Sequence, residues 1–127
     1  MVFFFVCYNW CMNRKENKKT GNWGEDLATK YLLENKYGII DRNINYPFGE
    51  IDILARDRKT IVIVEVKTVW GSGFGKAVDL VRRKKADKLR LLAKATEKDY
   101  PNENIRIDVI GIDSGIITHI KNAVEGK

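Results

Sequence analysis

Two short apolar runs with charged residues in their middles constrain this chain more than any other feature. The first covers residues 49–53 (GEIDI) and the second covers residues 61–67 (IVIVEVK). An unpaired charge is costly to bury in apolar surroundings, so such charges need partners. Because side chains of a strand alternate between its two faces, the two carboxyls of the first run share a face. The Glu and Lys of the second run share a face for the same reason.

The segment between these runs, residues 56–60, is short and polar, which favours an antiparallel hairpin. Such a hairpin can bring Asp52, Glu65 and Lys67 together at one end of a sheet. Carboxylate oxygens suit hard cations such as Mg²⁺ or Mn²⁺. A bound cation of this kind polarises a phosphoryl oxygen and lowers the pKa of water, and a lysine can orient that water. The alternative is a solvated strand face on which Lys67 neutralises a neighbouring carboxylate.

The rest of the pattern predicts an α/β domain with a central mixed sheet flanked by helices. Asn22 is a candidate N-cap for the first helix, and Gly38 is a candidate end. The predicted order is α-β-β-β-α-β-β. After the first helix it places a strand at residues 39–45, the two charged strands, a glycine-rich loop at residues 69–76, a basic helix at residues 79–98, and strands at residues 105–110 and 116–120.

Glu25 lies near the predicted start of the first helix, on the side shared with Ala28 and Leu32. In that position it can supply a further carboxylate to a metal ion. The alternative is a capping role, since Glu25 follows Asn22 by three residues and an acidic group in the first turn favours the helix dipole.

The composition fits one globular domain of 127 residues with a net charge of +6, which favours polyanionic partners. Residues 1–20 are expected to be a non-essential extension, residues 21–122 the domain, and residues 123–127 a tail. The apolar run at the start of the extension is much shorter than the roughly 20 residues of a spanning helix, so no stable membrane insertion is expected, with a weak membrane-surface anchor as the alternative. Both cysteines, Cys7 and Cys11, lie in this extension, and the absence of a disulfide framework favours the cytoplasm.

The predicted second helix carries the candidate contacts to a nucleic-acid backbone. Basic side chains there would bind phosphates without reading sequence, although a solvated helix face is the alternative. The candidates are Arg82, Arg83, Lys85 and Lys88. On the strand that follows, Asp108 is a candidate for a structural ion pair with Arg42 or Arg106.

A succession of motifs in the same order resembles the YraN family of small bacterial proteins, from about residue 21 to residue 112. That family is similar to archaeal Holliday junction resolvases and shares the restriction-endonuclease-like fold, for which the motif is PD-(D/E)xK. The chain departs from it at Val69 and Trp70, where the family often has a basic residue. The motifs are Gly24-Glu25-x-x-Ala28, Arg42-Asn43, Gly49-Glu50-Ile51-Asp52, Val64-Glu65-Val66-Lys67, Phe74-Gly75, Lys85 and Arg106-Ile107-Asp108-Val109.

By this resemblance, Glu25, Asp52, Glu65 and Lys67 would form the active-site set. The three carboxylates would hold Mg²⁺ or Mn²⁺, and Lys67 would position the water. The resemblance implies a metal-dependent nuclease that hydrolyses DNA phosphodiester bonds, with branched or junction DNA as a candidate substrate and a homodimer as the expected assembly. The alternatives are a non-catalytic nucleic-acid-binding accessory module of the same fold and a protein-interaction domain whose acidic cluster is paired internally.

Overall fold

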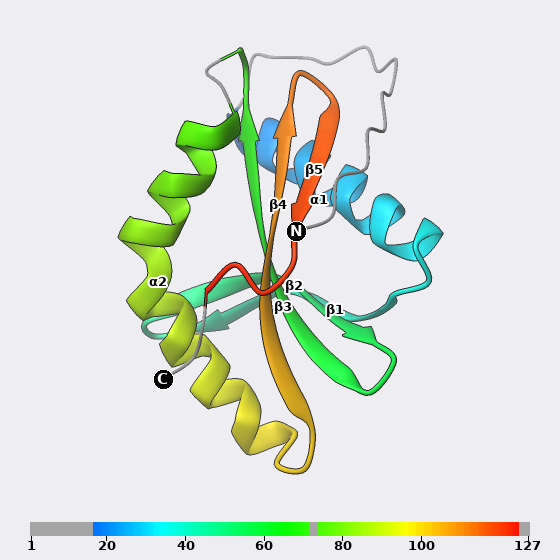
Figure 1. Ribbon diagram of the computed structural model, residues 1–127, viewed down its shortest axis with the longest axis vertical. Coiled ribbons are helices and arrows are strands. Elements are labelled where there is room, and N and C mark those ends of the chain that lie inside the picture. Colours follow the sequence, from blue (N-terminus) through cyan, green and yellow to red (C-terminus); the bar gives the residue numbers. More distant parts are fainter. Residues whose placement is uncertain (1–16, 72–73, 125–127) are drawn as a thin grey trace.

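The computed structural model describes residues 17–71 and 74–124, which form a five-stranded sheet between two helices (Figure 1). The α-β-β-β-α-β-β order confirms the prediction from sequence. The elements are α1 (Asn17–Glu34), β1 (Gly38–Tyr46), β2 (Gly49–Asp57), β3 (Thr60–Val69), α2 (Phe74–Asp99), β4 (Asn104–Asp113) and β5 (Ile116–Ile120).

The sheet is mixed, and its strands lie side by side in chain order from β1 to β5. β1, β2 and β3 form an antiparallel meander, and β5 is antiparallel to β4. β3 and β4 are parallel. A parallel pair needs a long crossover, and α2 supplies it. The expected β2–β3 hairpin is confirmed, with a loop of only Arg58 and Lys59.

Two apolar clusters bury the two faces of the sheet. The α1 cluster includes Leu32 from the helix and Val62 and Val64 from β3. The α2 cluster includes Leu89 and Leu92 from the helix and the alternate β3 side chains, Ile61 and Ile63. β3 therefore follows the predicted alternation, and Glu65 continues the row that faces α2.

The β1–β2 hairpin departs from simple alternation. Ile51 packs in the α2 cluster, whereas Ile53 packs in the α1 cluster, although strict alternation would put residues two apart on the same face. The β1–β2 pairing shifts register between Ile39 and Asp41, and Asn43 has a positive φ of 53°. Such irregularities bend and twist a strand. Figure 1 shows this hairpin swinging away from the direction of β4.

Helix α1 begins five residues before the predicted N-cap and ends four residues before the predicted stop. It starts at Asn17 and closes with a left-handed Lys36 (φ 68°) and a 2.9 Å bond from the Tyr37 N–H to the Leu32 carbonyl. The left-handed Lys36 ends the helix, which is the role expected of Gly38. Glu25 therefore lies in the middle of the helix, so the capping explanation for it is wrong.

Helix α2 begins at Phe74, so the glycine-rich loop is shorter than predicted. At the other boundaries the agreement is close, and β5 covers the predicted residues. The side chains of Ala123 and Val124, which the sequence assigned to a tail, pack in the α2 cluster. Residues 1–16 of the expected extension lie outside the described residues. Neither described helix is both long and apolar enough to cross a bilayer.

Candidate active site

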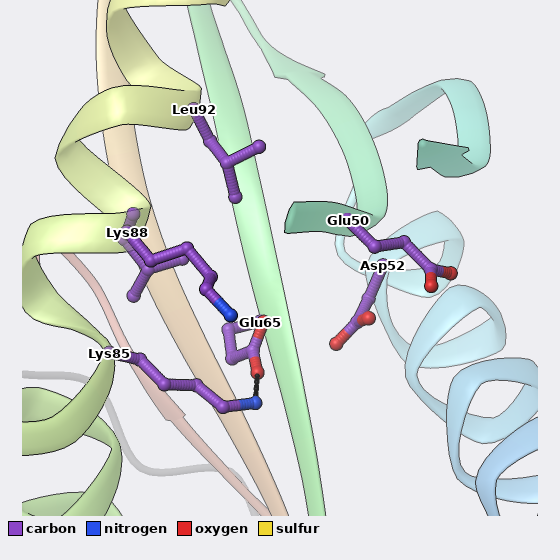
Figure 2. A pocket seen from close by; sticks show the side chains of 7 residues that line it. Glu50, Asp52, Glu65, Lys85, Lys88 and Leu92 are labelled. Atoms are coloured by element: carbon purple, nitrogen blue, oxygen red, sulfur yellow. Dashed lines mark hydrogen bonds and ion pairs between the residues drawn. The ribbon is translucent and has the colours of Figure 1, made fainter. Parts of the chain in front are cut away.

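The acidic residues of the two charged strands meet α2 around a cavity of about 200 Å³ (Figure 2). Strands β2 and β3 supply the carboxyl groups, and α2 supplies two lysines and an apolar wall. The lining residues are Glu50, Asp52, Glu65, Lys85, Lys88, Leu89 and Leu92.

Asp52 is held where the β2–β3 ladder comes apart. The last regular pair of this end is Ile53 with Val64. Beyond it, the Val66 N–H donates to Asp52 Oδ2 at 2.9 Å instead of to a backbone carbonyl. A buried amide needs an acceptor, and the carboxylate supplies one. This bond fixes the Asp52 carboxyl at the fork between the strands, facing Glu65.

Glu65 is 5% exposed, and its charge is balanced from the helix. Lys85 Nζ donates to Glu65 Oε1 at 2.5 Å (Figure 2). Burial works against the ammonium, but the hydrogen bond and charge of Glu65 outweigh it, so the pKa of Lys85 is raised. Lys85 was predicted to contact nucleic acid, and here it is also the internal partner of a site carboxylate.

Asp52 carries the most perturbed carboxyl of this cavity. Burial, followed by the negative charge of Glu65, raises its pKa from 3.8 to about 8, although the Val66 N–H and Lys85 favour the ionised form. Two carboxyls that share a poorly solvated site disfavour each other's ionisation. A cation between them would relieve that repulsion, so the donor set suits a hard divalent ion.

Glu25 approaches this site from the α1 side without lining the cavity. Its Oε1 is buried and has no hydrogen-bond partner among the described residues. The closest cation, Arg42 Nη2, is 3.7 Å away, and Arg42 Nη1 is bound to Asp26 at 2.8 Å. Burial raises the pKa of Glu25, opposed by Arg42 and assisted by Glu50. A buried carboxylate oxygen of this kind is a suitable donor for a cation.

Lys67 does not join the cavity lining, although strand alternation places it on the Glu65 face. Its side chain is exposed, and Lys85 is the residue that contacts Glu65. Of the other basic residues predicted to bind nucleic acid, Lys88 lines the cavity and Arg83 is exposed. The side chain of Arg82 lies outside the described part of the chain.

The fit of a metal ion rests on two carboxylates, Asp52 and Glu65. Within residues 17–71 and 74–124, no group of three or more His, Cys, Asp or Glu side chains is arranged to hold a metal. Mg²⁺ is commonly bound through one or two carboxylates and completed by waters and substrate phosphates, so two are sufficient. Glu25, the third carboxylate expected to bind the metal, does not line this cavity.

Sequence reasoning missed the pairing of Lys85 with Glu65, although the inward face of Leu89 and Leu92 was expected. The only signal was the helical spacing of Lys85, Leu89 and Leu92, which places all three on one face of α2. The suggested ion pair of Asp108 is found with Arg106 and not with Arg42, with Arg106 Nε donating to Asp108 Oδ1 at 2.8 Å.

Comparison with known proteins identifies the family. The model of the uncharacterised protein family UPF0102 matches residues 24–112, more than half of the chain. The chain belongs to the UPF0102 family. Among its relatives, a UPF0102 protein of Persephonella marina is 40% identical over 107 residues, which cover 83% of this chain and 92% of the relative. A UPF0102 protein of Geobacter sulfurreducens is 45% identical over 117 residues, which cover 86% and 91%.

UPF0102 is another name for the YraN family, so the resemblance drawn from the sequence motifs is confirmed at the level of the family. The matched region runs from the Gly24-Glu25 motif on α1 to the end of β4. It contains every residue of the acidic cavity.

Proposed function

We propose that this UPF0102 protein is a metal-dependent phosphodiesterase that cleaves DNA, built on a restriction-endonuclease-like fold. The observation that carries the proposal is the convergence of Asp52 and Glu65 at the fork of two strands, with the Asp52 pKa raised to about 8. Carboxyl groups whose pKa is strongly shifted by burial and by a neighbouring charge are common at functional sites. The resemblance in motif order supports the same activity.

In this proposal Asp52 and Glu65 would hold Mg²⁺ or Mn²⁺. The bound ion would polarise a phosphoryl oxygen and lower the pKa of a water. Lys85 bonds the Glu65 oxygen that faces it, so it would have to release that oxygen and turn toward the substrate. Lys67 is exposed on β3, and in this proposal it would orient the water.

Exposed cations beside the cavity support a polyanionic substrate. Lys85 and Lys88 line its helical wall, and Arg83 lies exposed on the same helix. Such contacts position a phosphate backbone but carry no sequence information. We therefore propose recognition of DNA by shape, which leaves branched and junction DNA as the substrates to test first. The homodimer expected from the resemblance is part of this proposal, and light scattering measures it.

The proposal is tested by offering labelled single-stranded, duplex, flap and four-way DNA to the purified protein with Mg²⁺ or Mn²⁺. Asp52→Asn and Glu65→Gln should abolish cleavage, whereas Glu97→Gln, an exposed change on α2, should leave it intact. Cleavage that survives Asp52→Asn and Glu65→Gln equally well would show a contaminant or another site, and the proposal would fall.

A second candidate is a module that binds nucleic acid without cutting it. The Lys85–Glu65 bond favours this alternative, because an ammonium already balances the carboxylate that a metal would need. DNA binding that is indifferent to Mg²⁺ and Mn²⁺, with no cleavage of any substrate, would select it over the enzyme.

A further inference from the structure

A second cavity of about 370 Å³ opens near the tip of the β2–β3 hairpin, beside the end of α1 and strand β5. Its size is within the range of about 300–1,000 Å³ that is usual for small-molecule sites, whereas the acidic cavity is smaller. The lining residues are Tyr31, Asn35, Lys36, Tyr37, Asp57, Arg58, His119 and Lys121.

Two lining residues, Tyr31 and His119, belong to a buried polar network that includes Asp108. Asp108 is fully buried and His119 is 1% exposed. Asp108 Oδ2 and His119 Nε2 are 2.7 Å apart, and His119 Nδ1 lies 3.0 Å from the Tyr31 hydroxyl. Burial opposes the Asp108 charge, but hydrogen bonds from His119 and Arg106 outweigh it and lower its pKa. An ionised carboxylate only accepts, so His119 Nε2 donates to Asp108 Oδ2.

The charges around the cavity do not balance. Three cations line it, Lys36, Arg58 and Lys121, against one carboxylate, Asp57. Asp57 already forms an ion pair with Arg106 Nη1 at 3.0 Å. Arg106 forms a second ion pair, with Asp108. The lining therefore carries three positive charges against one negative, an excess of two.

Two of these cations have no counter-ion among the described residues. Lys36 and Arg58 are exposed and form no ion pair there, whereas Lys121 Nζ lies 6.0 Å from the centre of the Tyr37 ring. Lys36 and Arg58 also occupy left-handed backbone positions, with φ of 68° and 57°. Glycine would fit both positions without strain, yet the chain places a long cation at each.

We infer that this cavity binds a small organic phosphate monoester, of sugar-phosphate or mononucleotide size. A phosphate monoester carries nearly two negative charges at neutral pH and three acceptor oxygens, which matches the excess of two positive charges. Lys36, Arg58 and Lys121 would hold the phosphate at the rim, and Asn35 and the tyrosine rings would contact the organic part. The site is separate from the acidic cavity and does not depend on its activity.

The test is calorimetric titration of the full chain with ribose 5-phosphate, adenosine 5′-monophosphate and inorganic phosphate. At least one monoester should bind, and Lys36→Gln and Arg58→Gln should each weaken it about ten-fold or more. Lys59→Gln removes the same charge from the same turn without touching the cavity lining, so it should leave binding unchanged. Asp52→Asn should also leave it unchanged, which separates this site from the proposed nuclease site.

Two further variants, Lys36→Gly and Arg58→Gly, distinguish loss of the ligand site from loss of the fold. Both should keep or raise the melting temperature, because they relieve left-handed strain, and both should lose the ligand. The inference is overturned if no monoester binds at millimolar concentration, if Lys59→Gln weakens binding as much as Arg58→Gln, or if inorganic phosphate binds as tightly as the esters. It is also overturned if these variants weaken the binding of duplex DNA but not of any monoester. The surface would then contact nucleic acid.

Discussion

At the scale of single residues, Asp52 couples the stability of the domain to pH. Its carboxyl has a folded pKa of about 8 against an ordinary value of 3.8. Between those values the folded chain keeps a proton that the unfolded chain has released, so stability falls as pH rises. The fall is at most about 1.4 kcal/mol per pH unit, and it ends above the folded pKa.

Asp52→Asn should remove this dependence in metal-free protein. The amide oxygen can still accept from the Val66 N–H, but the side chain has no proton to lose. In urea unfolding with a chelator present, the variant should match the unchanged chain near about pH 4 and exceed its stability near about pH 8. Asp99→Asn, an exposed change, is the control. A variant that is less stable at every pH would contradict the assignment.

Lys85 and Lys67 should differ in their effect on stability, because only Lys85 contacts a buried carboxylate. Lys85→Met leaves Glu65 without its partner and should cost about 1–3 kcal/mol in the free energy of unfolding at neutral pH. Lys67→Met should change it by no more than about 0.5 kcal/mol. Adding Glu65→Gln to Lys85→Met should recover part of the loss, and no recovery would argue against the pair.

At the scale of elements, the contact of α2 with the sheet depends on neighbouring leucines that have opposite surroundings. Leu92 is 1% exposed and forms part of the cavity wall, whereas Leu91 is 49% exposed. Leu92→Ala should cost about 2–5 kcal/mol through lost burial and the void left behind. Leu91→Ala should fall within about 0.5 kcal/mol of the unchanged chain. Denaturant midpoints compare the two, and similar losses would mean that α2 is wrongly rotated.

The strands were predictable from sequence to a greater degree than the helix starts and the site contacts. Alternation in β3 gave the correct faces for Ile61, Ile63 and Glu65, because a straight strand has one period. It failed between Ile51 and Ile53. The bend of β2 comes from its pairing with β1, and the spacing of apolar residues in the sequence does not reveal that pairing. The start of α1 was missed because residues 17–21 carry no apolar signal.

The acidic half of the site was predictable, but its basic half was not. Asp52 and Glu65 come from one hairpin, whose local pairing fixes which residues meet. Lys67 has the expected spacing, yet a long side chain at a strand end can point to solvent. Lys85 lies 20 residues from Glu65, on an element whose docking depends on the whole α2 cluster. Pattern reasoning gives a face of the helix but not the atom that a lysine will reach.

At the scale of the whole molecule, the excess of positive charge predicts DNA binding that weakens with salt. If Lys88 contacts a phosphate, Lys88→Gln should lower the slope of log affinity against log salt concentration by about 0.9. Lys98→Gln removes the same charge from the far end of α2, beyond the acidic cavity, and should leave the slope nearly unchanged. Fluorescence anisotropy with duplex DNA measures the slope for each variant and for the unchanged chain. Equal slopes for these three proteins would rule out the contact of Lys88 with a phosphate.

The bond from the Val66 N–H to Asp52 has a consequence for spectroscopy. Most ladder amides are held by carbonyls, which do not titrate, whereas this amide is held by a group that can be protonated or taken by a cation. Its hydrogen–deuterium exchange should quicken when either event occurs, while the amide of Val62, inside the regular ladder, should stay slow. Equal changes at both positions would instead indicate opening of the hairpin. The exchange rate of the Val66 amide therefore reports the ionisation of Asp52 on the neighbouring strand.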